Sequence, residues 1–387
     1  MIYLDNAATT LQKPASVPRA MAQAVQRCAN PGRGGYAASM QAADTLLELR
    51  QAAADCFDAD PEQVVLTMNA THGLNLAIRT LVSPGDRVVI SGYEHNAVVR
   101  PLHALGAELS VASRALFDPA RTAADFEAAI SRDTKAVIVN HASNVFGYVQ
   151  PVEEIAALCR QRGVPLIVDA SQSAGILPIS LRHLGAAFIA MPGHKALYGP
   201  QGTGLLLCGR LPDPLLFGGT GSQSRLPEMP DFLPDRAEAG TQNVPGAAGL
   251  LAGLGFVRGQ GSALRVRERQ CRAQLCRGLA AISGVQVFSG GADQLGVVSF
   301  RAAGMDCEDL AAQLAERGIA VRAGLHCAPL AHESAGTLGS GTVRASLGAF
   351  NRSEEIAAFL DAVEEILKKQ VGTQEKPLPF HGFSCII

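Results

Sequence analysis

Five segments of the chain carry polar side chains able to do chemistry, and each segment is the end of a short apolar run or directly follows one. In chain order these side chains are Asn69, Thr71, His72, His95, Asn144, Asp169, Gln172, His194 and Lys195. Singly, each has an ordinary explanation, because a His after a strand is often solvated and an Asp often caps a helix. Together they supply an amine, a carboxylate and several hydrogen-bond donors. That combination could hold a phosphorylated aromatic aldehyde.

Lys195 lies in a glycine-rich turn, GHKALYGPQGTG (193–204). An amine there can form a Schiff base with an aldehyde, and a buried Asp169 can keep a pyridine nitrogen protonated. Thr71 and the N–H groups at the start of a helix can bind a phosphate. These are the requirements of pyridoxal 5'-phosphate, so the residues predict a site for that cofactor.

The elements that position these residues read as an α/β fold. Near-continuous apolar runs at 64–67, 87–92, 135–140, 165–170, 186–191 and 202–208 predict buried strands. Helical patterns lie between them, as at 151–163, where Gly163 stands at the position of a C-cap. Alternation of strands and helices favours a doubly wound, mostly parallel sheet, whose ligands gather at the carboxyl ends of the strands.

A second, smaller unit follows. Residues 211–245 are rich in Gly, Pro and Ser and predict a long excursion, and a helix is expected at about 246–280. Beyond it we expect strands at 295–300 and 319–322 and helices at 307–317 and 353–369.

Composition excludes several classes of protein. The chain has 387 residues, which suggests about two domains, and a formal net charge of −2, which gives no electrostatic case for nucleic acid or an anionic membrane. Nine scattered Cys without a CxxC pair predict neither a disulfide framework nor a metal site. The first residues, MIYLDNAATT, lack the pattern of a signal peptide, and no apolar stretch is long enough to span a bilayer. We therefore expect a cytoplasmic protein.

The chain resembles the class V aminotransferase-like enzymes of fold-type I, in the cysteine desulfurase and selenocysteine lyase group, over about residues 1–370. The motifs that carry the resemblance are YLDNAATT (3–10), NATHGLN (69–75), EHNA (94–97), HASNVFG (141–147), VDASQS (168–173), GHKALYGPQGTG (193–204), EAGTQN (238–243), RAGLHC (322–327) and VRASLGAFN (343–351). The resemblance implies a large pyridoxal phosphate-binding domain with a mostly parallel mixed sheet, and a smaller α/β C-terminal domain. The expected boundaries are 13–255 for the large domain, 1–12 with 256–370 for the small domain, and 371–387 for a flexible tail.

The resemblance also implies roles around the cofactor. Lys195 would carry it, Asp169 would pair with its pyridinium nitrogen, and His95 would stack on the ring and shuttle a proton. Gln172 and Asn144 would hydrogen-bond its phenolic oxygen. The phosphate would be bound by Thr71, His194 and the amides around Ala70, and by Thr241 from the partner subunit, which implies a homodimer.

For the substrate, the resemblance implies that Arg344 grips the α-carboxylate, near Asn144, with the planar fork of a guanidinium. Cys327 would be the nucleophile. A buried, inert thiol is the ordinary alternative for a Cys, but Cys327 lies in a glycine-containing loop only 17 residues before Arg344. That short segment resembles the group with a less mobile catalytic loop, which delivers sulfur to a dedicated acceptor. His326, beside Cys327, is a candidate for lowering the pKa of the thiol.

Two positions depart from the family pattern. Pro192 stands three residues before Lys195, where a Ser or Thr usually gives a hydroxyl to the phosphate. Tyr36 stands near the place of a His in the segment that matches NPGRGGYAAS.

The sequence thus predicts a homodimeric enzyme that converts L-cysteine to L-alanine and leaves a persulfide on Cys327 for an acceptor protein or thiol. Three alternatives stay open: a selenocysteine lyase, a Cys-independent epimerase or β-eliminase, and a catalytically inactive protein that keeps the fold. Cys385, near the end of the tail, is a candidate second station in a sulfur relay, against the plainer interpretation of an incidental thiol.

Overall fold

The computed structural model describes residues 1–32 and 34–374, apart from the side chains of residues 262 and 371–374. Its larger part is built around one sheet. Within the described residues, seven strands join in the order β2-β8-β7-β6-β5-β3-β4. Their bounds are Val64–Thr67 (β2), Arg87–Ile90 (β3), Glu108–Val111 (β4), Thr134–Asn140 (β5), Leu166–Asp169 (β6), Phe188–Pro192 (β7) and Gly204–Cys208 (β8). In this sheet β8 alone runs opposite to the other six strands, so the predicted mostly parallel sheet is confirmed.

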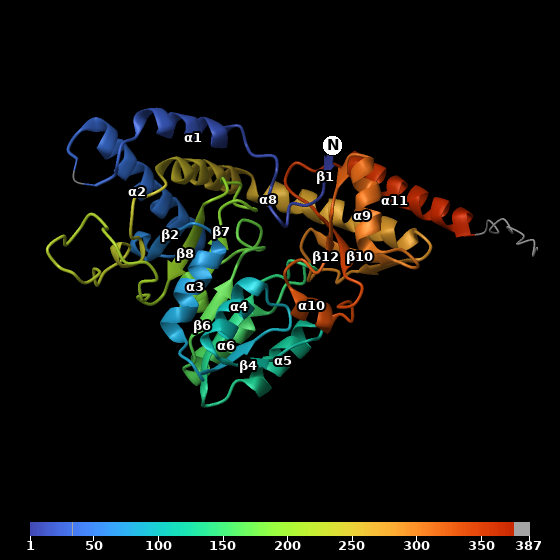
Figure 1. The fold of residues 1–387 in the computed structure, drawn as a ribbon, viewed down its shortest axis with the longest axis horizontal. Helices are drawn as coiled ribbons and strands as arrows, with labels where there is room; N and C mark the ends of the chain where they lie inside the picture. Colours follow the sequence, from blue (N-terminus) through green and yellow to red (C-terminus); the bar gives the residue numbers. More distant parts are fainter. Residues whose placement is uncertain (33, 375–387) are drawn as a thin grey trace, which may run out of the picture.

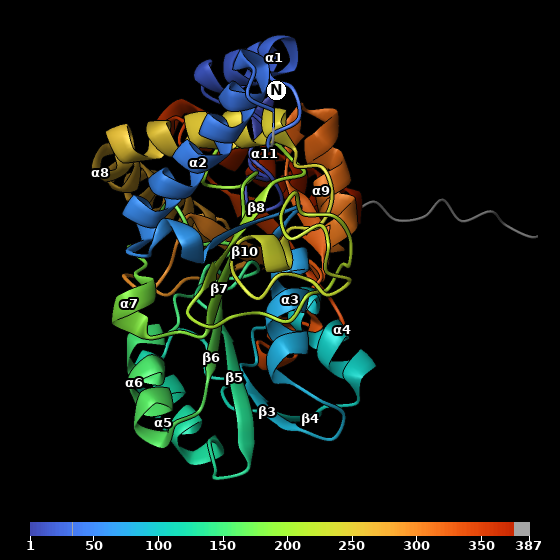
Figure 2. The same ribbon diagram turned by 90° about the vertical axis from the view of Figure 1, so that its left-hand side faces the viewer.

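Helices cover both faces of this sheet, which is why its strands are apolar without alternation. On one face lie α3 (Ala70–Leu81) and α4 (Asn96–Leu105), and on the other lie α5 (Pro119–Ala129), α6 (Val152–Arg162) and α7 (Leu181–Leu184), as Figure 2 shows edge-on. Helix α6 ends at Gly163 with φ 66°, as the sequence predicts.

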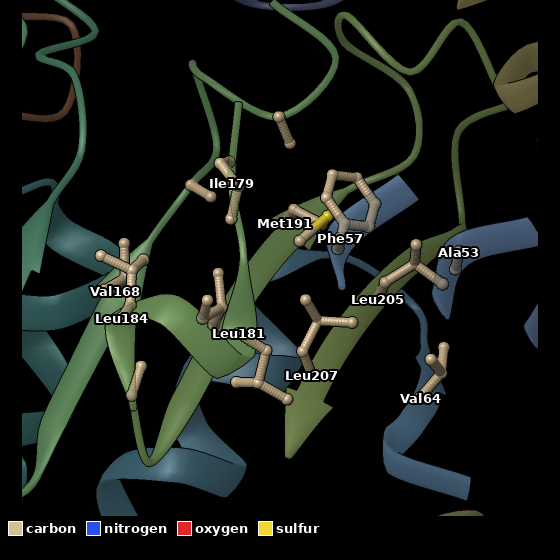
Figure 3. Close-up of a cluster of buried hydrophobic side chains, with 14 of the residues drawn as sticks. Ala53, Phe57, Val64, Val168, Ile179, Leu181, Leu184, Met191, Leu205 and Leu207 are labelled. Atoms are coloured by element: carbon tan, nitrogen blue, oxygen red, sulfur yellow. The ribbon is translucent and has the colours of Figure 1, made fainter. Parts of the chain in front are cut away.

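The core on the second face is continuous with α2 (Ala37–Phe57). Figure 3 shows Phe57 of α2 and Leu181 of α7 beside Met191 of β7 and Leu205 of β8. All four side chains are at most 3% exposed. Burying a side chain of this size stabilises the fold by about 1.5–3 kcal/mol, so this core fixes the strands whose ends carry the polar residues.

A second sheet lies beside the first part, with the order β12-β13-β10-β9. Its strands are Val285–Phe288 (β9), Val297–Ala302 (β10), Arg322–Gly324 (β12) and Thr342–Ser346 (β13), packed with α9 (Cys307–Glu316) and α11 (Ser353–Gln374). Short α10 (Pro329–Ser334) lies between β12 and β13. The predicted helix 307–317 and strand 295–300 are close to α9 and β10, whereas β9, β12 and β13 were not predicted as separate strands.

The N-terminal segment of the chain reaches this smaller part. β1 (Ile2–Tyr3) pairs in parallel with β11 (Ile319–Ala320), and Asp5 bridges Ser346. Helix α8 (Val244–Ala281) runs from α1 (Ser16–Arg27) and α2 across to the smaller part (Figure 1). These contacts support, as a proposal, the division into 13–255 and 1–12 with 256–370. Helix α11 runs to Gln374, past the predicted start of the tail, and Cys385 with the rest of 375–387 lies outside the described residues. No helix in the described part of the chain combines the length and apolarity needed to cross a membrane.

Candidate active site

A cavity of about 220 Å³ lies at the carboxyl ends of the parallel strands. Eight of the nine residues predicted to bind the cofactor line it: Ala70, Thr71, His95, Asn144, Asp169, Gln172, His194 and Lys195. They follow β2, β3, β5, β6 and β7, which converge at one edge of the sheet. Parallel strands therefore bring together residues up to 125 positions apart in sequence, from Ala70 to Lys195.

Lys195 and Asp169 supply opposite charges in this cavity. Lys195 is half-buried, and burial lowers the pKa of its amine to about 8, although Asp169 acts in the opposite direction. Asp169 is 4% exposed, and its Oδ1 accepts a hydrogen bond from Ser171 N at 2.9 Å. A buried carboxylate and an amine that loses its proton near pH 8 match the roles predicted for a pyridinium partner and an aldehyde-binding lysine.

His95 begins α4 and is oriented by the backbone. Its Nδ1 accepts a hydrogen bond from Ala97 N at 3.0 Å, so the proton of the neutral ring lies on Nε2. Burial lowers the pKa of His95, Asp169 opposes that change, and Lys195 adds to it. His95 is thus a neutral imidazole that presents a single N–H to the cavity.

Helix α3 starts at the cavity wall. Asn69 caps it, since its side chain accepts a hydrogen bond from His72 N at 2.9 Å. The N–H groups of Ala70 and Thr71 have no acceptor within the helix, because a first helical turn leaves its donors free. These donors and the helix dipole make an anion site of the kind predicted for the phosphate.

Arg344 adjoins the cavity through Asn144. Its Nη1 donates to Asn144 O at 2.9 Å and its Nη2 donates to Asp5 Oδ1 at 2.7 Å, while Nε is buried without a partner among the described residues. Asn144 Nδ2 donates to His326 O at 2.8 Å, and Asn144 Oδ1 is likewise buried and unpartnered in that part of the chain. Two unsatisfied buried groups side by side indicate that a polar ligand belongs there.

Cys327 is exposed in the turn between β12 and α10. Its carbonyl oxygen accepts a hydrogen bond from Asn96 N at 2.8 Å, which places it next to His95. Cys327 and His326 both have left-handed backbones, with φ 56° and 50°. Such a conformation costs about 1–2 kcal/mol per residue away from glycine, and it is typical of functional turns.

The structure corrects the hypothesis about His326. Its ring is 6% exposed, and burial together with the charge of Arg344 lowers its pKa to about 2. His326 is therefore neutral and brings no positive charge to the neighbouring thiol.

His194 is held by the N-terminal segment. Its Nδ1 lies 3.0 Å from Thr9 Oγ1, and its carbonyl accepts from Lys13 Nζ at 2.9 Å. Burial, with Lys195 and Lys13 nearby, lowers the pKa of His194 to about 4. His194 is therefore a neutral imidazole at pH 7.

Sequence reasoning missed the role of Asp5, which forms an ion pair with Arg344 across 339 residues. The signal was present, since Asp5 lies within the YLDNAATT motif, but the motif does not reveal the partner. Asn140 and Ser171 were also missed and line the cavity.

The remaining predicted positions lie elsewhere. Thr241 is exposed and lines a different cavity of about 180 Å³ rather than the main cavity of its own chain. Pro192 ends β7 in the wall of the main cavity, where it offers no hydroxyl, and Tyr36 is exposed at the start of α2. No group of three His, Cys, Asp or Glu among the described residues is arranged to hold a metal ion.

The donor set of the main cavity fits pyridoxal phosphate. An amine, a buried carboxylate, a neutral imidazole and a helix N-terminus line one cavity, and these are the groups that an aldehyde, a ring nitrogen, a ring face and a phosphate would contact. Arg344 Nε, a buried donor without a partner among the described residues, remains for an anionic group of the substrate.

Comparisons with known proteins agree with this geometry. The model of the class V aminotransferase family matches residues 2–359. A probable cysteine desulfurase of Methanothermobacter thermautotrophicus is 35% identical, with 94% of each chain covered. The apo structure of a cysteine desulfurase from Thermococcus onnurineus NA1 has a TM-score of 0.86, 33% identity and 95% coverage of each chain. The Escherichia coli cysteine desulfurase CsdA has a TM-score of 0.83 and 26% identity, covering 95% of this chain and 94% of its own.

With a family match over nearly the whole chain and a relative 35% identical over 94% of it, the chain belongs to the class V aminotransferase family of pyridoxal phosphate-dependent enzymes.

Proposed function

We propose that this enzyme is a cysteine desulfurase, which takes sulfur from L-cysteine, releases L-alanine and leaves a persulfide on Cys327. The observation that carries the proposal is that Cys327, an exposed cysteine, is bound through its backbone carbonyl to Asn96 N, the residue that follows His95 in the wall of the cavity with Lys195 and Asp169. Transaminases and epimerases need the amine and the carboxylate, but only removal of sulfur or selenium needs the thiol. Curated relatives named probable cysteine desulfurases support the same activity.

Bound pyridoxal phosphate supplies an electron sink that stabilises negative charge on the substrate's Cα. Asp169 keeps the ring nitrogen of that group protonated. Lys195 Nζ has a pKa of about 8, so it is mostly neutral above that pH and can remove the Cα proton of the bound substrate. His95 exchanges a proton through Nε2, since its Nδ1 is occupied by Ala97 N.

Arg344 orients the substrate by its α-carboxylate. Its unpartnered Nε and the remaining Nη protons offer a fork to two carboxylate oxygens. The backbone carbonyl of Asn144 accepts a hydrogen bond from Arg344 Nη1, so Asn144 lies beside the same guanidinium. Asp5 fixes the guanidinium on the far side, so the fork is already oriented when substrate arrives.

Cys327 carries out the sulfur transfer. Its thiolate forms a bond to the substrate sulfur while the carbon–sulfur bond breaks, and the electron pair of that bond stays on the amino-acid fragment. The fragment takes up protons and leaves as alanine, so one sulfur atom moves and no external oxidant is needed. The persulfide then passes to an acceptor thiol by exchange.

The catalytic turn is tied to the larger part of the protein. Ser334 Oγ of α10 donates to Gly92 O at 2.9 Å, and Glu333 pairs with Arg114 at 3.0 Å. These contacts support a short catalytic loop of restricted motion, which presents its sulfur at the surface to a dedicated acceptor.

We also propose a cytoplasmic homodimer. Thr241 lies outside its own cavity and is exposed, which suits contact with the phosphate of a partner subunit. The eight cysteines of the described residues are all free thiols, which suits a reducing compartment. The proposed relay through Cys385 concerns a residue outside those described and stays a prediction.

The test is incubation of the purified enzyme with L-cysteine and, separately, L-selenocysteine, each with a reductant. Alanine, sulfide and selenide would be quantified together. A desulfurase yields alanine and sulfide in equal amounts from cysteine. Alanine from selenocysteine alone would make the enzyme a selenocysteine lyase, and pyruvate instead of alanine would indicate a β-eliminase.

A further inference from the structure

Glu94 is a fully buried carboxyl beside His95 to which the mechanism above gives no task. Its Oε1 accepts a hydrogen bond from Asn140 N at 2.9 Å and another from Ser91 Oγ. Asn140 ends β5 and lines the main cavity, and in the sheet register it lies directly opposite Asp169 of β6. The Glu94 side chain therefore bonds the turn that carries His95 to the strand next to Asp169.

The Glu94 carboxyl supplies an acceptor that the sheet itself lacks at this point. The ladder between β3 and β5 ends where Ile90 pairs with Ile138, two residues before Asn140. Beyond that pair the chain turns away from β3 toward α4, so β3 offers Asn140 N no backbone partner. A buried N–H without an acceptor is costly. Glu94 thus satisfies this N–H and, by the same bond, fixes the position of its own turn.

The other end of the turn is bonded away from the sheet. Asn96 N donates to Cys327 O at 2.8 Å, and Cys327 lies in a loop of the smaller part. On the side of the sheet, Tyr93 O accepts from Asn140 Nδ2 next to the Glu94 contact. The bonds to Asn140 are therefore what ties the turn to the strands of the cavity.

The Glu94 carboxyl is neutral at pH 7. Burial raises its pKa to about 8, and the charge of Asp169 adds to the effect. Oε1 accepts both hydrogen bonds, while Oε2 is buried without a partner among the described residues, so the proton of the neutral acid lies on Oε2. An amide has the same shape and the same accepting oxygen. Gln can therefore take the place of Glu94 in both contacts.

We propose that Glu94 is a positioning residue, which bonds its turn to Asn140 and thereby holds the ring of His95 at the main cavity. The inference rests on the proposed function and adds one residue to its machinery. Glu94 does not line the cavity, so it acts through His95 rather than on the substrate. Its removal should affect the chemical steps and leave the grip on the substrate's α-carboxylate intact.

The test compares Glu94→Met, which keeps the volume and removes the acceptor, with Glu94→Gln, which keeps the acceptor. In the holoenzyme, Glu94→Met should lower kcat for alanine release from cysteine about 10- to 100-fold, the size expected when a reacting group is misplaced, with KM nearly unchanged. It should also alter the visible circular dichroism of the bound cofactor, which reports the surroundings of the ring and requires no reaction. Glu94→Gln should keep most of the activity and the wild-type spectrum.

A double-mutant cycle separates positioning from a general loss of stability. Glu94→Met should lower kcat much less in a His95→Gln background than in wild type, because the effect passes through His95. If Glu94→Met does not fold, Ser91→Ala removes one of the two donors to Oε1 and should give a smaller loss with the same dependence on His95.

The matched control is Thr134→Val, at the opposite end of β5 from Asn140. Thr134 is buried, and its Oγ1 accepts from Ser131 N at 2.9 Å, so this variant also loses a hydrogen bond of a buried side chain. It should unfold at a lower temperature than wild type and keep the wild-type kcat and dichroism, with and without His95.

Three results would overturn the inference: wild-type kcat and dichroism in Glu94→Met, an equal loss of kcat in both His95 backgrounds, or a loss in Glu94→Gln as large as in Glu94→Met. Failure of the proposed function is distinct, because wild type would then release no alanine from cysteine. The dichroism of the variants would still report whether Glu94 holds the surroundings of the cofactor.

Discussion

Lys195, the lysine proposed to bind the cofactor, must be a free amine to react with it, and its surroundings favour that form. Burial moves its pKa from 10.5 to about 8, and the charge of Arg344 adds to this effect. The neutral fraction of the amine therefore rises with pH and reaches half near pH 8. A solvated lysine would reach that point only above pH 10.

We predict that the rate of cofactor binding to the apoprotein rises with pH and levels off beyond about pH 8. Stopped-flow absorbance after mixing with pyridoxal phosphate measures it. Borohydride reduction and peptide mass spectrometry should place the pyridoxyl group on Lys195, and Lys195→Ala should yield no such peptide. A rate that still climbs at pH 10, or a label on another lysine, would contradict the assignment.

Arg344→Lys should raise KM for L-cysteine about 10- to 100-fold, because a point charge cannot copy a bidentate fork whose hydrogen bonds to a charged group contribute roughly 1.5–3 kcal/mol. Cofactor affinity, measured by equilibrium titration, should change little. Unaltered KM in this variant would remove Arg344 from the substrate site.

At the scale of elements, the N-terminus of helix α3 is the proposed phosphate site. Asn69→Ala removes its cap and should cost about 1 kcal/mol of stability in thermal unfolding. The same substitution should weaken cofactor binding, because the first turn of α3 lines the cavity. The losses of stability and of cofactor affinity are expected together, because the Asn69 side chain caps the first turn of α3, where the phosphate is proposed to bind.

Asp118→Ala is the matched control, since Asp118 caps α5 by accepting from Arg121 N at 3.0 Å. It should lose a similar amount of stability and keep wild-type cofactor affinity. Equal cofactor affinity in both variants would show that the start of α3 does not hold the phosphate.

Elements differ in how far the sequence predicts them. Buried strands such as β5 and β6 were predicted because helices on both faces require continuous apolar runs. Strand β4 was missed because it lies at the sheet edge with exposed Glu108 and Leu109. Strand β13 was missed because Arg344 stands at its centre and Thr342 and Ser346 at its ends, polar residues that interrupt the apolar pattern.

The residues of the site were likewise predicted only in part. Residues after predicted strands were placed together correctly because parallel strands end at one edge. The pairing of Asp5 with Arg344 and of Glu94 with Asn140 depends on contacts between distant segments. Neither leaves a local pattern in the sequence.

At the scale of the whole molecule, the proposed dimer makes a prediction about which subunit Thr241 serves. Suppose that Thr241 acts in the partner's site, and that a heterodimer combines one Lys195→Ala subunit with one Thr241→Ala subunit. One of its two active sites is then intact, and the other lacks both Lys195 and Thr241. Co-expressed and purified with two affinity tags, it should regain about half of wild-type activity with wild-type affinity for the cofactor. An active site that keeps the weak affinity of the Thr241→Ala homodimer would show that Thr241 acts within its own subunit.

The central claim, that Cys327 receives the sulfur, is tested most directly by a single turnover with limiting L-cysteine and mass spectrometry of the alkylated protein. One extra sulfur atom should appear on the peptide that contains Cys327, together with one equivalent of alanine. Cys327→Ala should still bind cofactor and substrate yet form neither product, and Cys276→Ala, at a half-buried thiol of α8, should behave as wild type. Alanine formed at the wild-type rate by Cys327→Ala, or sulfur found first on another cysteine, would contradict the account.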